Sequence, residues 1–233
     1  MSNPSLKNRI QVVLDTIPID FGGGCSIEKA LVMGSLIEKY ELQKTLDIGV
    51  YRGRSLFPQA IAHAQYSKGK VYGVDPYRNE EARQFDNPAL TQALEDFARV
   101  TDFEALYQDV LTLRQQHGLQ NHCELVRKRS DEAAKGFGQA GVRFDLIHID
   151  GNHDTKAVMS DVELYLPLLS RNGFIVLDDI SWTSVKPAMA KLDGLLNKVF
   201  ELTGIGNDFA VYWNGTSWYR NYRIKKFLKE VVG

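Results

Sequence analysis

The sequence has little of several features that mark special classes of protein. It holds only two cysteines, Cys25 and Cys123, which lie far apart and match no metal-binding spacing. Few, unclustered thiols are typical of a cytoplasmic protein. No apolar run approaches the roughly 18 residues that a membrane span requires, and residues 1–20 lack the apolar core of a signal peptide. We therefore expect a cytoplasmic protein with no membrane partner.

An excess of charge of one sign is also absent. The chain has 28 Lys and Arg against 29 Asp and Glu, a formal net charge of −1 at pH 7. Nucleic acids attract proteins largely through clustered positive charge, so we expect no nucleic-acid partner. A composition that is 44% hydrophobic and 24% charged is ordinary for a folded protein. We expect residues 1–233 to form a single domain.

Short apolar runs alternate with helical patterns from residue 44 onward. Both faces of each run are apolar and rich in β-branched residues, as in parallel strands covered by helices. The expected strands are residues 44–49, 70–75, 123–128, 144–150 and 173–178, and the expected helices between them are residues 55–65, 87–116 and 155–169. This alternation predicts an α/β fold with a doubly wound, mostly parallel sheet.

Two flanking pieces complete the expected domain. Residues 1–43 are interpreted as an N-terminal helical lid or cap, broken by three glycines at 22–24. Residues 44–215 form the expected Rossmann-like core, in which a helix from Pro187 leads to residues 208–213. Residues 208–213 are expected to form a closing hairpin with residues 217–222, just beyond this core. Residues 216–233 are expected to be a basic strand and helix tail.

Glycines and an acid follow the first two expected strands, where ligands bind in an open parallel sheet. The first strand leads into the segment Asp47–Ser55, in which Gly49 and Gly53 permit a tight turn and close approach of a ligand to the backbone. This Gly-x-x-x-Gly spacing differs from the Gly-x-Gly-x-x-Gly of nicotinamide and flavin sites. Asp75 ends the second strand and can accept hydrogen bonds from ribose hydroxyls, although an Asp that starts a turn is the alternative. Together the two features favour a nucleoside-bearing cofactor.

Ser130 and Asp131 follow the third strand. They are placed to touch the base of such a cofactor. A helix that begins with Ser130 as its N-cap explains the same residues equally well.

Acidic residues end the fourth and fifth strands. Asp150 ends the fourth, and Asp178 and Asp179 end the fifth, so three carboxylates meet at neighbouring strand ends. Their repulsion favours a cation among them, and oxygen ligands suit Mg²⁺ or another hard divalent ion. The alternative is a set of solvated carboxylates at loop starts. His153 lies close enough to this site to act as a general base.

These motifs resemble the class I S-adenosylmethionine-dependent methyltransferases over residues 46–213. The first motif of that class matches Asp47–Gly53, and its ribose-binding acid matches Asp75. Residues 144–153 and 166–179 are similar to a narrower branch, the metal-dependent O-methyltransferases of antibiotic and sugar tailoring. The resemblance implies a seven-stranded Rossmann-like sheet, His153 as catalytic base, Asp150, Asp178 and Asp179 as metal ligands, and a cofactor site formed by Gly49, Tyr51, Gly53, Ser55, Asp75, Ser130 and Asp150.

The implied function is methyl transfer from S-adenosylmethionine, with Mg²⁺, to a hydroxyl of a small molecule such as a sugar, polyol, polyketide or phenol. Three alternatives stay open: a metal-independent methyltransferase of the same fold, a nicotinamide-dependent oxidoreductase, and a non-catalytic module that binds S-adenosylmethionine. Residues 77–122 match nothing in the resemblance. The sequence does not identify the methyl acceptor. It also leaves the oligomeric state open, and a homo-oligomer is compatible with it.

Overall fold

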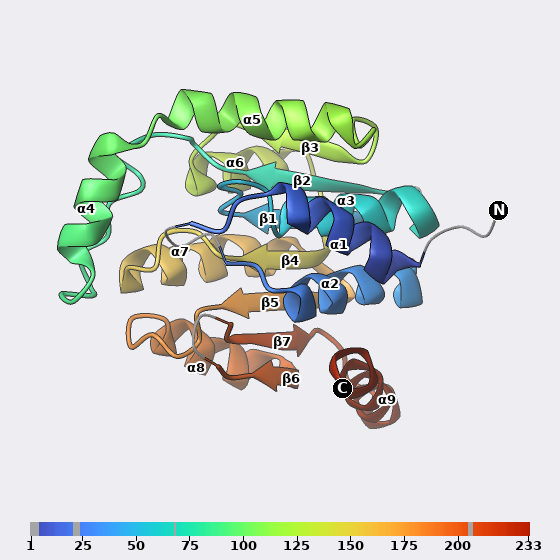
Figure 1. Cartoon of the computed structure of the whole chain (residues 1–233). Coiled ribbons are helices and arrows are strands. Elements are labelled where there is room, and N and C mark those ends of the chain that lie inside the picture. The colour runs from blue at the N-terminus through green and yellow to red at the C-terminus, as the bar shows by residue number, and fades with distance from the viewer. Residues whose placement is uncertain (1–4, 21–23, 68, 205–206) are drawn as a thin grey trace.

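One mixed sheet forms the centre of the protein (Figure 1). The computed structural model describes residues 5–20, 24–67, 69–204 and 207–233. Within them seven strands lie in the order β3-β2-β1-β4-β5-β7-β6. They are β1 (Lys44–Ile48), β2 (Lys70–Val74), β3 (Cys123–Val126), β4 (Phe144–Ile149), β5 (Leu169–Asp178), β6 (Asn197–Leu202) and β7 (Phe209–Trp213). β7 runs antiparallel to both of its neighbours and the other pairs are parallel, which confirms the doubly wound, mostly parallel sheet.

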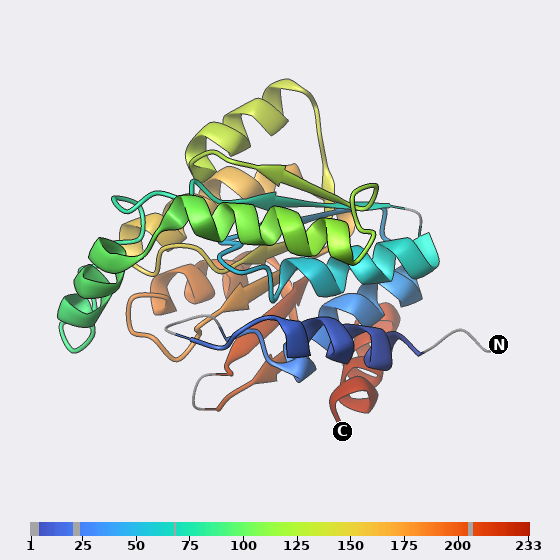
Figure 2. The same ribbon diagram turned by 45° about the horizontal axis from the view of Figure 1, so that its top comes forward.

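Helices cover both faces of the sheet, as Figures 1 and 2 show from two directions. They are α1 (Leu6–Thr16), α2 (Ile27–Tyr40), α3 (Leu56–Ala62) with the π-helical turn η1 (His63–Ser67), α4 (Thr91–Val100), α5 (Phe103–Gln116), α6 (Ser130–Gln139), α7 (Thr155–Tyr165) with the 3₁₀ turn η2 (Leu166–Leu168), α8 (Lys186–Leu195) and α9 (Trp218–Val232). Among the described residues, no helix has both the length and the hydropathy needed to span a membrane.

Two hydrophobic clusters hold these layers together. Buried side chains of α1, α2, α3, α5 and α9 pack on one face of the sheet, and those of α6, α7 and α8 pack on the other. Because side chains alternate along a strand, Leu146 faces the first cluster and Ile147 the second, and both are fully buried. This two-sided burial explains why the central strands have continuous apolar sequences.

The expected closing hairpin is wrong in one of its strands. β7 is where it was predicted, but its hairpin partner is β6, in the segment expected to be the end of a helix. Residues 217–222 begin α9 instead, where the Ser217 side chain caps the helix by accepting a hydrogen bond from the Arg220 N–H. The aromatic run that follows Ser217 resembles a strand locally, but the buried Ile224 and Leu228 have the spacing of a helix.

The single helix expected over residues 87–116 is also wrong, because two helices lie there. α4 ends at Val100, and α5 begins after Asp102, whose side chain accepts a hydrogen bond from the Ala105 N–H. This N-cap lets the chain turn between the two helices. α4 extends beyond the carboxyl ends of the parallel strands, at the left of Figure 1.

Helix α9 should be part of the cooperative fold rather than a loose tail. We expect Leu228→Ala to lower the free energy of unfolding by about 2–5 kcal/mol, because it leaves a cavity at a fully buried position. Urea unfolding followed by circular dichroism measures this change. Tyr222→Ala, at a side chain that is 60% exposed on the same helix, is the control and should change stability little. Equal effects of the two variants would show that α9 does not pack as described.

Candidate functional site

The carboxyl ends of β1 and β4 approach each other closely at the point where the strand order reverses. Gly49 follows β1 with φ +85°, and a Cβ atom there would lie 1.9 Å from the main-chain oxygen of Asp150, which follows β4. Only glycine fits both this backbone conformation and this contact. In an open α/β sheet a ligand crevice is expected at such a switch point.

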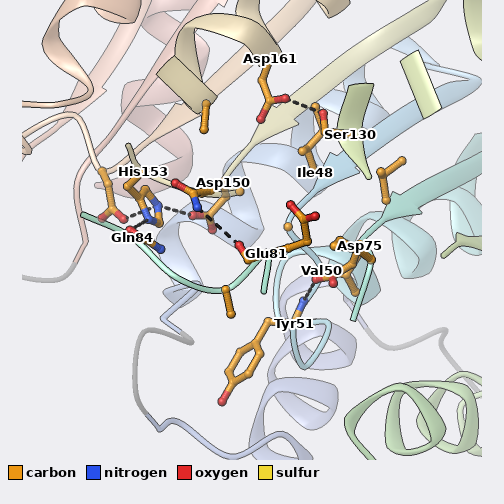
Figure 3. A pocket seen from close by; sticks show the side chains of 18 of the residues that line it. Ile48, Val50, Tyr51, Asp75, Glu81, Gln84, Ser130, Asp150, His153 and Asp161 are labelled. Atoms are coloured by element: carbon orange, nitrogen blue, oxygen red, sulfur yellow. Dashed lines mark hydrogen bonds and ion pairs between the residues drawn. The ribbon is translucent and has the colours of Figure 1, made fainter. Parts of the chain in front are cut away.

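The loop after β1 is fastened to Asp75 at the end of β2. One carboxylate oxygen of Asp75 accepts a hydrogen bond from the Tyr51 N–H at 2.9 Å, and the other accepts one from the Tyr77 N–H at 2.7 Å. Burial raises the pKa of Asp75, although these backbone donors act in the opposite direction. Asp75, Gly49 and Tyr51 all line one cavity of about 660 Å³. The structure thus brings the predicted glycine loop and the predicted ribose acid together, as Figure 3 shows for Tyr51 and Asp75.

Two predicted cofactor contacts also have structural roles. The Ser55 hydroxyl donates to the buried carboxylate of Asp47 at 2.8 Å, so it is directed into the protein although Ser55 borders the cavity. Gly53, with φ +85°, sits against the ring of Phe57 and closes the turn into α3. A cofactor role for Ser55 would therefore have to use its backbone.

Ser130 is not the N-cap that one interpretation of the sequence expected. Helix α6 begins at Ser130 without a side-chain cap, and the hydroxyl of Ser130 donates to the carboxylate of Asp161 (Figure 3). Burial raises the pKa of Asp161 to about 6. Both residues line the same cavity, on the side of the β3 end. Asp161 was missed in the sequence, although an acid beside Val158, Val162 and Tyr165 on the buried face of α7 was a signal.

His153 joins two of the predicted metal ligands. Its Nε2 atom lies 2.8 Å from Asp179 Oδ2 and 3.4 Å from Asp150 Oδ1. Its Nδ1 atom contacts the side-chain oxygen of Gln84 at 3.2 Å (Figure 3), and its ring lies 4.9 Å from that of Trp182. Gln84 orients the imidazole so that Nε2 faces the two carboxylates.

Titration of this cluster is strongly shifted by the surroundings. Burial alone would lower the pKa of His153, but its hydrogen bonds with Asp150 and Asp179 outweigh burial and raise that pKa to about 10. Burial and the nearby charge of Asp178 raise the pKa of Asp150 to about 7. The cluster therefore holds a proton at neutral pH when no metal ion balances its carboxylates.

The third predicted metal ligand, Asp178, points the other way. Its side chain is buried, forms an ion pair with Lys29 of α2, and does not line the cavity. Asp179 has φ +50°, which turns its carboxylate toward His153 instead. An oxygen of Asp178 still lies within 4.8 Å of an oxygen of Asp150. The structure thus separates the three aspartates into Asp150 and Asp179 at the cavity and Asp178 behind them.

A second buried ion pair supports this cluster from β1 and β4. His148 Nδ1 lies 2.6 Å from Asp47 Oδ1, and both side chains are fully buried. The Nε2 atom of His148 lies 3.8 Å from Asp178 Oδ2. Burial opposes protonation, but the hydrogen bonds with Asp178 and Asp47 raise the pKa of His148 to about 10. His148 is thus a structural cation.

The segment between β2 and α5, unmatched in the sequence, forms a wall of the cavity. Asn152 Nδ2 donates to the Arg83 carbonyl at 2.7 Å, and Asp154 Oδ1 accepts from the backbone N–H groups of Phe85 and Asp86. These contacts hold the segment against the start of α7. The residues of this segment that line the cavity include Arg78, Glu81, Ala82, Gln84, Leu90, Leu94 and Phe97.

The N-terminal segment reaches the same cavity from another side. Asp20 accepts hydrogen bonds from the Tyr51 hydroxyl at 2.9 Å and from Arg52 at 2.8 Å, and Arg54 donates to main-chain oxygens of α1 and the residue after it. Cys25 also lines the cavity. The predicted lid role of residues 1–43 stays a prediction, and residues 1–4 and 21–23 of that segment lie outside the described residues.

The donors present fit the two groups that the sequence predicted. A cavity lined by Asp75, residues 49–52 and Ser130 suits a nucleoside cofactor, although the predicted Gly53 does not itself line it. For a hard cation, Asp150 and Asp179 offer oxygens at the cavity, while the Oδ1 atom of Asp178 is buried without a hydrogen-bond partner within the described residues. A buried, unpartnered carboxylate oxygen beside a second carboxyl group suits a cation.

Comparisons with known proteins agree with this fold. Residues 46–180 match the family model described as a methyltransferase domain. The chain is 30% identical over 157 residues to tricin synthase 1 of Oryza sativa subsp. japonica, a match that covers 67% of this chain and 53% of the relative, so the chain spans about half of that relative's length.

Two solved structures share the fold. The O-methyltransferase TomG of Streptomyces achromogenes, in complex with SAM, superposes with a TM-score of 0.61 at 13% identity, over 93% of this chain and 92% of TomG. An O-methyltransferase of Bacillus cereus, in complex with SAH, has a TM-score of 0.60 at 12% identity, over 91% of each chain. Together with the family match over more than half of the sequence, the seven-stranded sheet shows that the chain belongs to the methyltransferase-domain family and has the Rossmann-like class I fold.

Proposed function

We propose that the protein transfers the methyl group of S-adenosylmethionine to a hydroxyl group of a small molecule, with a divalent cation such as Mg²⁺ at the acceptor. One observation carries the proposal: the Asp150, His153 and Asp179 side chains meet on the wall of the same cavity that Asp75 and residues 49–52 line. The proposed base and the proposed cation ligands therefore lie beside the proposed nucleoside site. The TomG and tricin synthase matches support a methyltransferase.

The cofactor half of the proposal uses residues of β1, β2 and β3. Asp75 would hold the ribose hydroxyls, since its two carboxylate oxygens have about four lone-pair positions and can accept more hydrogen bonds than the backbone N–H groups of Val50, Tyr51 and Tyr77 supply. The main chain of Gly49–Gly53 would bind the methionine end, and Ser130 with Asp131 would border the adenine. When bound, S-adenosylmethionine supplies an electrophilic methyl group on a sulfonium centre.

The acceptor half uses the ends of β4 and β5. Asp150, Asp178 and Asp179 would hold the cation, which when bound lowers the pKa of an acceptor hydroxyl and fixes its oxygen. His153 would accept the hydroxyl proton at Nε2, with Gln84 fixing the ring. Because Asp150 and Asp179 keep His153 protonated in the ion-free protein, His153 can serve as a base only when another positive charge balances them. The base and the cation are therefore interdependent.

Acceptors with two neighbouring hydroxyls, among catechols, sugars and polyols, fit this proposal best. The wall formed by the segment after β2 combines apolar side chains, such as Leu94 and Phe97, with charged ones, such as Arg78 and Glu81. Trp182 offers a flat apolar surface next to His153.

Binding of S-adenosylhomocysteine tests the cofactor half. We expect calorimetry to show binding by the wild type, and Asp75→Ala to weaken it by about 10–100-fold, because hydrogen bonds to a charged acceptor are lost. Asp15→Ala, at an exposed carboxylate of α1, is the control and should bind normally. Absence of binding by the wild type would refute the proposed function.

The close approach at Gly49 makes a second prediction about the cofactor site. In Gly49→Ala the added methyl group would collide with the Asp150 main chain, so we expect weaker S-adenosylhomocysteine binding, by at least about tenfold, and lower stability. Gly118→Ala is the matched control, since Gly118 also has positive φ but no atom within 4 Å of its added Cβ. The control should lose only about 1–2 kcal/mol of stability from the backbone conformation. Full cofactor affinity in Gly49→Ala would contradict the described contact.

The base should show itself in the pH dependence of turnover. On an acceptor found by screening, we expect kcat of the wild type to rise with pH as His153 loses its proton, and this rise to be absent in His153→Ala. The kcat of the variant should be about 10²–10⁴-fold lower than that of the wild type, and its affinity for S-adenosylhomocysteine should be unchanged. Stopped-time product assays from pH 5 to pH 10 measure both effects.

Two comparisons complete this experiment. The ring of His117 contacts Thr16 away from the cavity, so His117→Ala should keep the wild-type pH profile. EDTA should abolish wild-type turnover at neutral pH, and added Mg²⁺ should restore it. An unchanged profile in His153→Ala would exclude the base, and EDTA-resistant turnover would favour the metal-independent alternative.

A further inference from the structure

Lys29 is a buried cation in a place that the proposed chemistry does not explain. It lies on α2, is only 2% exposed, and its ammonium group pairs with Asp178, 149 positions further along the chain. Burying an ammonium group is costly unless it is paired. Lys29 lies in the buried apolar stripe of α2 together with Met33 and Leu36, on the side of the helix that faces the sheet.

Only one oxygen of Asp178 is used by this pair. Lys29 contacts Oδ2, whereas Oδ1 is buried with no hydrogen-bond partner within the described residues. An oxygen of Asp178 lies within 4.8 Å of an oxygen of Asp150, and the Asp150 carboxyl group can donate a hydrogen bond to Asp178 only while it is protonated. When both groups are ionised, neither can donate to the other. The unsatisfied oxygen therefore marks a place for a cation beside Asp150.

Counting charges shows what Lys29 does to this place. Asp47, Asp150, Asp178 and Asp179 carry four negative charges when ionised. The buried cations Lys29 and His148 reduce the sum to two when His153 is neutral, as its proposed role as base requires. The remaining charge equals that of one divalent cation.

We propose that Lys29 is a built-in counter-ion that limits the charge and the affinity of the candidate metal site. This inference rests on the proposed function for the identity of the metal site. Lys29 would occupy one oxygen of Asp178 permanently and leave the other for the divalent ion. The backbone of Asp178 does not depend on Lys29, because it is paired with Phe209 of β7 in the sheet. Removing the ammonium should therefore change the charge of the site more than its geometry.

The proposal predicts tighter metal binding by Lys29→Met. Even in a water-like dielectric, loss of a unit positive charge about 5 Å from a divalent ion strengthens binding by about tenfold, and by more in a buried site. Mn²⁺ titrated into the cofactor-free protein, followed by electron paramagnetic resonance and calorimetry, measures this affinity without any enzymatic turnover. We expect at least a tenfold lower Kd than in the wild type.

Lys70→Met is the matched control. It removes the same charge from an exposed ion pair with Glu124, at the amino end of β2, and should leave Mn²⁺ affinity unchanged. Lys29 does not line the cavity, so Lys29→Met should also bind S-adenosylhomocysteine like the wild type. Absence of S-adenosylhomocysteine binding by the wild type would refute the proposed function, whatever the Mn²⁺ titrations show.

A double variant keeps the test decisive if Lys29→Met folds poorly. Asp178→Asn should weaken Mn²⁺ binding, and adding Lys29→Met to it should recover at least about tenfold, since the unpaired ammonium is removed. Folding of Lys29→Met only in the presence of Mn²⁺ would also support the proposal. Unchanged or weaker Mn²⁺ binding by folded Lys29→Met, no recovery in the double variant, or no Mn²⁺ binding by any of these proteins would overturn it.

Discussion

The balance of buried charge at the carboxyl ends of β1, β4 and β5 is the constraint on which the rest of the structure depends. Asp47 is paired with His148, Asp178 with Lys29, and Asp179 with His153. Carboxylates in such surroundings would be costly without these cations. Helix α2 must therefore dock against the sheet to deliver Lys29, which fastens the N-terminal part of the chain to the end of β5. The stability of the domain and the electrostatics of its candidate site have the same origin.

The candidate cofactor site depends on close contact between backbones rather than on charge. Asp150 belongs both to this site and to the acidic cluster. Its main-chain oxygen borders Gly49, and its carboxylate faces His153. A shift of the Asp150 main chain would therefore widen the cofactor loop and move a candidate metal ligand at the same time. This shared residue explains how the candidate nucleoside cavity and the candidate cation cluster can be adjacent without a separate domain for each.

The fold was largely predictable because the central strands are buried on both faces, which leaves a continuous apolar signal in the sequence. Asp75 and Asp150 were also predictable, since the end of a parallel strand is a fixed place in the fold. The direction of a side chain was not: Asp178 and Asp179 are neighbours in sequence, yet a left-handed conformation at Asp179 sends them to different partners. Lys29 could have been noticed as a charge in an apolar stripe, but its partner, 149 positions away, has no local signal. The strand predicted at residues 217–222 was wrong because their aromatic pattern favours a strand locally, whereas the helical spacing of buried residues becomes visible only further along α9.

The acceptor wall is held by the same loop that carries the candidate catalytic residues. Asn152 and Asp154, on either side of His153, bind the main chain of residues 83–86, and Asp86 in return accepts from the Thr155 N–H at 2.8 Å. Gln84 lies within this bound stretch and contacts His153 directly. An acceptor that moves this wall must therefore also move the partner that orients the imidazole. In the proposed mechanism, recognition of the acceptor and alignment of the base would therefore be linked, and variation in the segment after β2 would change both which hydroxyl is bound and how well it is deprotonated.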